Sequence, residues 1–129
     1  MTNQVDKFFD YDQNTHVEKL QNMYWDNEDF ICLTDTEIYN YANLIDATKE
    51  GVKLVMEFKL VRDSIKFQLI NKDNALVVVS GKLNVVLTDS TQVIYEPYVC
   101  SILFRKIDDA WKISYFQQAS EIASSPPDN

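Results

Sequence analysis

Glycine, histidine and cysteine are all scarce in this chain of 129 residues. Its two glycines, Gly51 and Gly81, cannot form the glycine-rich loop that phosphate-binding and dinucleotide-binding sites need. Its single histidine, His16, excludes the HExxH motif and histidine-rich metal sites. Two cysteines, Cys32 and Cys100, are too few for a zinc site of their own or for a disulfide framework. We therefore expect neither a metal ion nor a cofactor.

Positive charge is scarce as well, because 12 Lys and Arg face 20 Asp and Glu and leave a net charge of −8. The basic residues are scattered singly, whereas nucleic-acid binding needs a basic stripe, and the acidic balance disfavours anionic membrane surfaces. No apolar run approaches the roughly 18–20 residues of a membrane helix, and the N-terminus lacks the apolar segment of a signal peptide. We expect a cytoplasmic protein with no nucleic-acid or membrane partner, whose two cysteines are reduced and buried.

The first part of the chain has sequence features typical of helices. Residues 1–14 predict an N-terminal arm or a short helix. Thr15 and Glu18 then form a capping box. Apolar residues follow at helical spacing, which predicts a helix near 15–25.

The next part of the chain mixes helical and strand signals. We expect a short helix over about 26–33, capped by an acidic or amide side chain. The tyrosine and isoleucine content of 35–45 favours a strand. Asp46 or Thr48 then caps a third helix, which carries apolar residues over 52–60 on one side.

Alternating apolar residues in the second half of the chain predict a meander of long antiparallel strands. Gly81 and Pro97 are expected to bend two of them. Helices followed by such a meander indicate an α+β domain, with N-terminal helices packed on one face of a curved, mostly antiparallel sheet. The concavity between the two layers is a common place for a ligand pocket. The expected strands cover residues 65–70, 75–88, 92–107 and 111–120.

One stretch, 105–120, resembles the final hairpin of the SnoaL-like branch of the NTF2-like superfamily, whose cone is also called cystatin-like. A basic strand end at Arg105 leads into an acidic turn, then Trp111-Lys-Ile and a closing Ser120. The segments Asp73-Asn-Ala75-Leu-Val-Val-Val and Tyr24-Trp25-Asp-Asn-Glu-Asp-Phe30 are similar to earlier parts of that family. The resemblance covers roughly 15–120, leaving 121–129 as a disordered tail or linker stub.

This resemblance implies a fold more than an activity, because the family contains isomerases, cyclases and dehydratases as well as non-catalytic modules. Many relatives carry histidines on the last strand, where this chain has Tyr115 and Gln117. The resemblance therefore implies a non-catalytic sensory or interaction module of a bacterial signalling protein, which forms a homodimer through its sheet and holds a small apolar ligand. The alternative is a cofactor-independent isomerase, cyclase or hydrolase.

The enzymatic alternative needs a carboxylate in an apolar pocket beside a hydrogen-bond donor. Glu96 and Asp46 are the candidate bases, although a bend in water explains the first and a helix cap the second. Tyr98, Tyr115 or Tyr41 is the candidate oxyanion donor.

Aromatic side chains near the expected sheet are the candidates for ligand binding, although ordinary core packing also explains them. Residues 113, 115 and 117 share one face of a regular strand, so Tyr115 and Gln117 line the cavity if that face looks inward and a dimer surface if it looks outward. The expected ligand-binding residues are Tyr41, Tyr98, Trp111, Tyr115 and Gln117.

Overall fold

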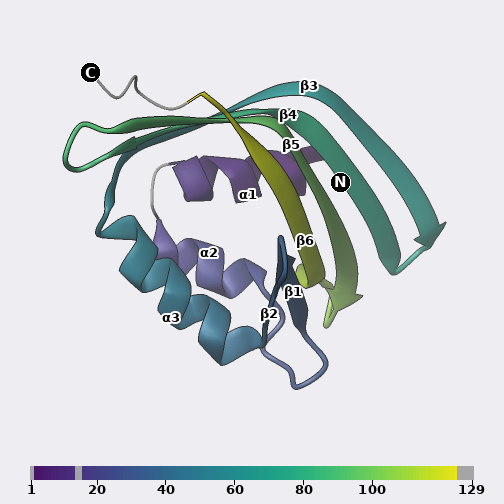
Figure 1. Cartoon of the computed structure of the whole chain (residues 1–129). Helices are drawn as coiled ribbons and strands as arrows, with labels where there is room; N and C mark the ends of the chain where they lie inside the picture. Colours follow the sequence, from purple (N-terminus) through teal and green to yellow (C-terminus); the bar gives the residue numbers. More distant parts are fainter. Residues whose placement is uncertain (1, 14–15, 125–129) are drawn as a thin grey trace.

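A strongly curved sheet wraps around three helices in the computed structural model, which describes residues 2–13 and 16–124 (Figure 1). The six strands of the sheet lie in the order β2-β1-β6-β5-β4-β3. All neighbours are antiparallel except β1 and β6, which are parallel. The elements are α1 (Thr2–Gln13), α2 (Val17–Met23), β1 (Ile31–Thr34), β2 (Glu37–Tyr39), α3 (Tyr41–Val52), β3 (Val55–Asn71), β4 (Asn74–Leu87), β5 (Gln92–Ile107) and β6 (Ala110–Ser124).

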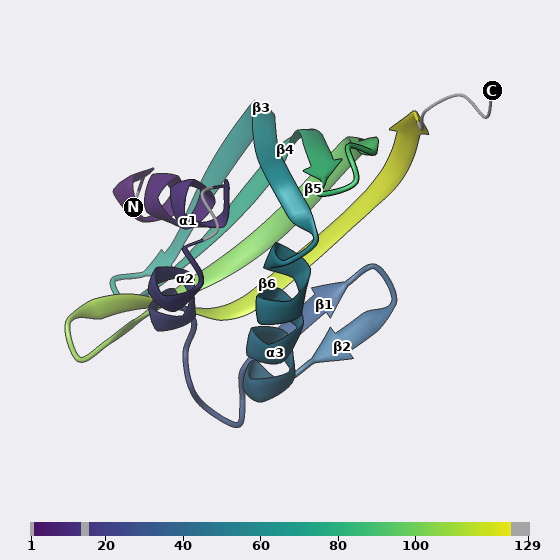
Figure 2. The same ribbon diagram turned by 90° about the vertical axis from the view of Figure 1, so that its left-hand side faces the viewer.

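The α+β architecture predicted from the sequence is confirmed. All three helices cover the same, concave face of the sheet (Figure 2). Strand β4 shows why: its residues alternate between buried and half-buried along its length, so every second side chain points toward the helices. No helix in the described ranges has the length and apolar character needed to cross a membrane.

The predicted bend at Gly81 is also confirmed. The pairing of β4 shifts register on both sides of this residue, opposite Arg62 and Ser64 on β3 and opposite Tyr98 on β5. A Cβ atom at Gly81 would lie 2.2 Å from the backbone oxygen of Val61. Only glycine allows the two strands to come this close at the bend. Pro97 also coincides with a register shift, but β5 continues through it.

The short helix predicted over 26–33 is wrong, because Ile31–Thr34 form strand β1. Its residues pair with β6, and Cys32 faces the core while Ile31 is exposed. This segment is too short for its hydrophobic period to distinguish a helix from a strand. It forms a strand because the edge of β6 is available for pairing. The helix near 15–25 is confirmed as α2, whereas its expected cap, Thr15, lies outside the described residues.

The strand predicted over 35–45 is correct only for Glu37–Tyr39. The third helix begins earlier than predicted, because the side chain of Asn40 accepts a hydrogen bond from the backbone N–H of Asn43 at 2.8 Å and caps α3. Asp46 and Thr48 therefore lie inside the helix and do not cap it.

The apolar residues beyond α3 belong to strand β3, not to a helix as predicted. Phe58 and Leu60 pair with Val85 and Leu83 of β4, so cross-strand pairing overrides the helical spacing that we identified there. At the other end of the chain, β6 continues through 121–124, where we expected the tail to begin. The remaining expected tail, 125–129, lies outside the described residues.

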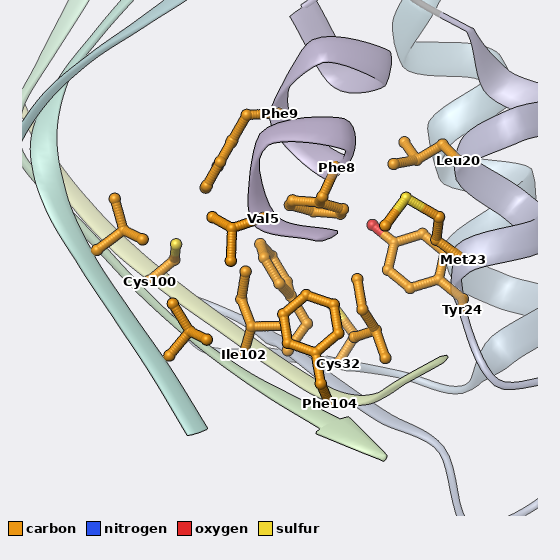
Figure 3. Close-up of a cluster of buried hydrophobic side chains, with 14 of the residues drawn as sticks. Val5, Phe8, Phe9, Leu20, Met23, Tyr24, Cys32, Cys100, Ile102 and Phe104 are labelled. Carbon is orange, nitrogen blue, oxygen red and sulfur yellow. The ribbon is translucent and has the colours of Figure 1, made fainter. Parts of the chain in front are cut away.

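The hydrophobic core lies mainly between α1, α2 and the sheet (Figure 3). Helix α1 contributes Val5, Phe8 and Phe9, all of them buried. The ring of Phe8 lies 5.4 Å from that of Phe116 and 6.0 Å from that of Tyr24. The segment for which we expected an arm or a short helix is thus a helix packed into the core. Side chains therefore fill this part of the concave face.

Candidate functional site

A cavity of about 440 Å³ lies between the C-terminal end of α3 and the concave face of the sheet. One of its walls is apolar and the opposite wall is polar. Such a combination of an apolar surface and a few placed polar groups is typical of small-molecule sites. The described residues that line it are Thr34, Asp35, Gly51, Leu54, Val55, Phe58, Leu83, Val85, Leu87, Tyr95, Tyr98, Gln118 and Ser120.

The apolar wall follows from the alternation of the two strands that form it. Phe58 of β3 pairs with Val85 of β4, and Leu83 and Leu87 follow on the same face of β4. Gly51 near the end of α3 has no side chain, and a Cβ atom there would meet nothing within 4 Å. The missing side chain leaves space at the mouth of the cavity.

The polar wall is a chain of hydrogen bonds that crosses three neighbouring strands. The hydroxyl of Tyr98 on β5 donates to Oε1 of Gln118 on β6 at 2.7 Å. Nε2 of Gln118 in turn donates to Oγ1 of Thr34 on β1 at 3.3 Å. We call Tyr98, Gln118 and Thr34 the polar chain. Because strands β1, β6 and β5 are adjacent, the sheet order itself brings these three side chains together.

Asp35 is the one carboxylate among the described residues that line the cavity. It lies in the turn between β1 and β2 with a φ of 51°, a conformation that aspartate tolerates better than most residues. Its Oδ1 accepts a hydrogen bond from the backbone N–H of Ser120 at 3.2 Å, and its own N–H donates to the carbonyl of Gln118 at 3.0 Å. These bonds hold the carboxylate of Asp35 beside the polar chain.

Asp35, Thr34 and Gln118 were not among the site residues predicted from the sequence. An aspartate between two short strands is a turn signal, and it could have indicated a hairpin over 31–39 had β1 been identified as a strand. The inward direction of Gln118 has no signal in the sequence, because it depends on an irregularity in β6.

That irregularity is a bulge at Ser114. Phe104 of β5 pairs with Ile113, but the preceding Leu103 pairs with Tyr115, so Ser114 is the extra residue. Before the bulge the odd-numbered Ile113 faces the core, and beyond it the even-numbered residues of β6 do, so Phe116 is buried. The expectation that residues 113, 115 and 117 share one face is therefore wrong.

Tyr115 and Gln117 consequently lie on the outer face of the sheet and do not line the cavity. The hydroxyl of Tyr115 donates to Oε1 of Gln117 at 2.9 Å, in an exposed position. Of the five aromatic and amide residues expected to bind a ligand, the structure places only Tyr98 in the cavity wall.

Tyr41 and Trp111 lie elsewhere. The Tyr41 hydroxyl donates to the carbonyl of Gln21 at 3.4 Å, between α3 and α2. Trp111 lies beside the turn between β5 and β6, with the ammonium of Lys106 at 5.9 Å from its ring centre. Both side chains pack against the core, as aromatic side chains commonly do.

Neither candidate base lines the cavity. Glu96 and Asp46 are both exposed, the first on β5 and the second on α3. A carboxylate surrounded by water lacks the desolvated setting that a general base in an apolar pocket has. The structure therefore does not bring either carboxylate together with the hydroxyl of Tyr98 in an apolar pocket.

Cys32 lies behind the polar chain, with its Sγ atom 3.9 Å from Oγ1 of Thr34. Burial raises the pKa of the Cys32 thiol to about 11, and the contact with Thr34 opposes this only in part. The thiol is thus protonated at neutral pH and is a poor nucleophile. Cys32 and Cys100 are buried and form no disulfide, as the sequence predicted. In the described part of the chain, no group of three or more His, Cys, Asp or Glu could hold a metal ion.

A second hollow, of about 460 Å³, lies between α1 and β3. Charged side chains form most of its lining, and an ion pair of 3.1 Å between Arg62 and Asp6 spans the two elements. Both partners are about half exposed, so this hollow is a polar surface groove. The cavity at the end of α3 is the better candidate site, because it combines a buried hydroxyl with an apolar wall.

Comparison with solved structures shows many proteins of the same fold. An NTF-2 like protein of unknown function from Shewanella oneidensis has a TM-score of 0.70 and 17% identity, over 92% of this chain and 94% of its own. A hexachlorocyclohexane dehydrochlorinase (LinA) of type 2 has a TM-score of 0.79 and 10% identity, over 99% and 90% of the two chains. The type 3 enzyme from Novosphingobium barchaimii has a TM-score of 0.73 and 11% identity, over 98% and 88%.

Identities this low show a common fold and nothing more. Comparison with curated proteins gave no match. The sequence model of the SnoaL-like domain, in contrast, matches residues 2–123, which include every described helix and strand except the last residue of β6. This match also covers α1, which the resemblance noted in the sequence did not include. By this match, and by its NTF2-like fold, the chain belongs to the SnoaL-like domain family.

Proposed function

We propose that this protein is a non-catalytic binding module, which holds a small and largely apolar ligand in the cavity at the end of α3. The SnoaL-like fold supports either a small-molecule-binding domain or an enzyme of the isomerase or dehydratase type. The hydrogen bonds of the polar chain favour the binding domain over the enzyme. Within it, Tyr98 donates its proton to the amide oxygen of Gln118, and an amide is not a base at neutral pH. Such a chain can orient a ligand but supplies no group for proton abstraction.

The enzymatic alternative lacks support from its own candidate residues. Glu96 and Asp46 are exposed and do not line the cavity. Asp35 does line it, but this carboxylate is exposed to water and is bonded to the backbone of Ser120. A general base for isomerisation is usually desolvated within an otherwise apolar pocket, and none of these three carboxylates is placed in that way.

Filling the cavity tests this proposal. In the Gly51→Leu variant, the new side chain enters open space at the cavity mouth. Naphthylmethanol, a neutral apolar probe, should bind the natural protein and should bind the variant at least about tenfold more weakly, because the space for it is lost. Isothermal titration calorimetry measures both affinities, and native mass spectrometry of gently purified protein shows whether a cellular ligand is retained.

The matched control is Ala47→Leu, which adds the same side chain at an exposed position of the same helix. Its affinity for naphthylmethanol should equal that of the natural protein. If the probe fails to bind the natural protein, or if Gly51→Leu leaves its affinity unchanged, the cavity is not a ligand site.

We also propose that the module forms a homodimer through the outer face of its sheet. A row of apolar side chains crosses four strands there: Leu76, Leu103, Tyr115 and Ile31 are successive partners on β4, β5, β6 and β1. We call these four residues the outer row. Gln117 lies beside it on the same face, two residues further along β6. A row on one face can meet its own copy across a two-fold axis, as isologous interfaces do.

A charge in the outer row should therefore abolish the dimer. Ile31 is 44% exposed, so the Ile31→Asp variant should fold yet sediment as a monomer, whereas the natural protein sediments as a dimer. Leu69→Asp is the control, because Leu69 is 72% exposed at the far end of β3 and lies outside the row. A monomeric natural protein, or dissociation caused equally by both variants, would contradict this interface.

We further propose that the module acts in the bacterial cytoplasm as an input domain in signalling. Two buried cysteines that form no disulfide are consistent with such a reducing compartment.

A further inference from the structure

We propose that the cavity selects ligands whose polar end donates hydrogen bonds and carries positive charge, namely an amine on an apolar body, and that it rejects carboxylates. This inference rests on the proposed function and concerns the ligand class of the same cavity. It follows from how the donors, acceptors and charges of the polar wall are arranged.

Three donors of the polar wall are already used within the protein. The hydroxyl proton of Tyr98 goes to Gln118, and an N–H of Gln118 goes to Thr34. The backbone N–H of Ser120 goes to Asp35. A carboxylate ligand accepts hydrogen bonds only, so it would have to compete with these acceptors for the same protons. An amine brings its own protons to the oxygen atoms of the wall.

The charge of the wall favours the same ligand. Asp35 brings a carboxylate to this wall, and a carboxylate can accept bonds at both of its oxygens. Its one bond to the backbone of Ser120 leaves capacity for an ammonium group. Among the described lining residues there is no Lys, Arg or His to balance this charge. Lys53, which precedes the lining residue Leu54, pairs with Glu50 at 3.1 Å.

The two walls together define an orientation for the ligand. Its ammonium group would lie at the turn between β1 and β2, near Asp35, and its apolar body would contact Phe58, Leu83 and Val85 on the opposite wall. The net charge of −8 of the whole chain adds to the attraction for cations and to the repulsion of anions.

Three probes with one apolar body and different polar ends test this inference: naphthylmethylamine, naphthylmethanol and naphthoate. In calorimetric titrations at neutral pH, the amine should bind at least about tenfold more tightly than the carboxylate, with the alcohol between them. In the Asp35→Asn variant, the affinity for the amine should fall about fivefold, the size expected of one partly screened ion pair, while the affinity for the alcohol stays the same. Asparagine tolerates the same backbone conformation and retains an acceptor for Ser120, so this variant should fold.

The control variant is Asp46→Asn, which removes an equal charge from an exposed position of α3 away from the cavity. It should leave all three affinities unchanged. If naphthoate binds as tightly as the amine while naphthylmethanol also binds, the selectivity for amines is wrong and the binding module stands. Equal losses in the two variants would likewise overturn the role of Asp35. If none of the three probes binds, the proposed function fails together with this inference.

Discussion

Replacing Gly81 by alanine should lower the free energy of unfolding by about 3 kcal/mol, the upper part of the usual range for overpacking. The new methyl group would lie 2.2 Å from the backbone oxygen of Val61 and 3.1 Å from the Cα atom of Arg62. These are backbone atoms of the neighbouring strand β3, so no flexible side chain can move aside. The two strands would have to separate at the bend that shapes the concave face. Urea denaturation followed by circular dichroism measures the loss.

Gly51→Ala is the matched control. A Cβ atom there meets nothing within 4 Å, and the residue lies in α3. Alanine forms helices better than glycine, so this variant should be more stable by about 0.5 kcal/mol. If Gly81→Ala is as stable as the natural protein, the close approach of β3 and β4 does not exist in solution.

Replacing Phe8 by alanine should cost about 3–5 kcal/mol, the usual range for a fully buried phenylalanine. Phe8 is 1% exposed and contacts the rings of Phe9, Tyr24 and Phe116. Its removal leaves a cavity between α1 and the sheet that the neighbouring rings cannot close. Thermal and urea unfolding of the variant measure the effect.

The exposed leucine at the end of β3 supplies the control for this loss. Leu69→Ala removes a large apolar side chain from a 72% exposed position, and its stability should change by less than about 0.5 kcal/mol. A loss of only that size in Phe8→Ala would mean that α1 does not belong to the core. The comparison thus also tests where the domain starts, because our sequence-based domain began at residue 15 and left 1–14 outside.

Much of the sheet was predictable because long strands carry a repeating signal. The odd-numbered residues of β4 are apolar except Gly81, which lies where the strand bends. The hairpin at 105–120 carried enough of the family pattern to identify the fold. The segment 26–60 was not predictable in the same way. There, short strands have little periodicity of their own, and β1 forms only because β6 offers it an edge to pair with.

The candidate site shows the limit of sequence patterns more sharply. Tyr98 was identified from its place on an apolar strand, and it does line the cavity. Tyr115 and Gln117 were assigned by counting residues along a regular strand, and a single bulge at Ser114 turned both of them to the outer face. Nothing in the local sequence marks that bulge, since it arises from how β5 and β6 pair.

The sequence by itself determined the class of fold, the bend at Gly81, the burial of the two cysteines and the absence of glycine-rich and histidine-rich motifs. Each of these depends on residue types and local periods, which a single chain segment carries. The tertiary structure alone decided that Thr34, Asp35, Gln118 and Ser120 join Tyr98 around one cavity. Thr34 and Asp35 are far along the chain from the hairpin of β5 and β6 that carries the other three residues, and only the order and register of the strands bring them together.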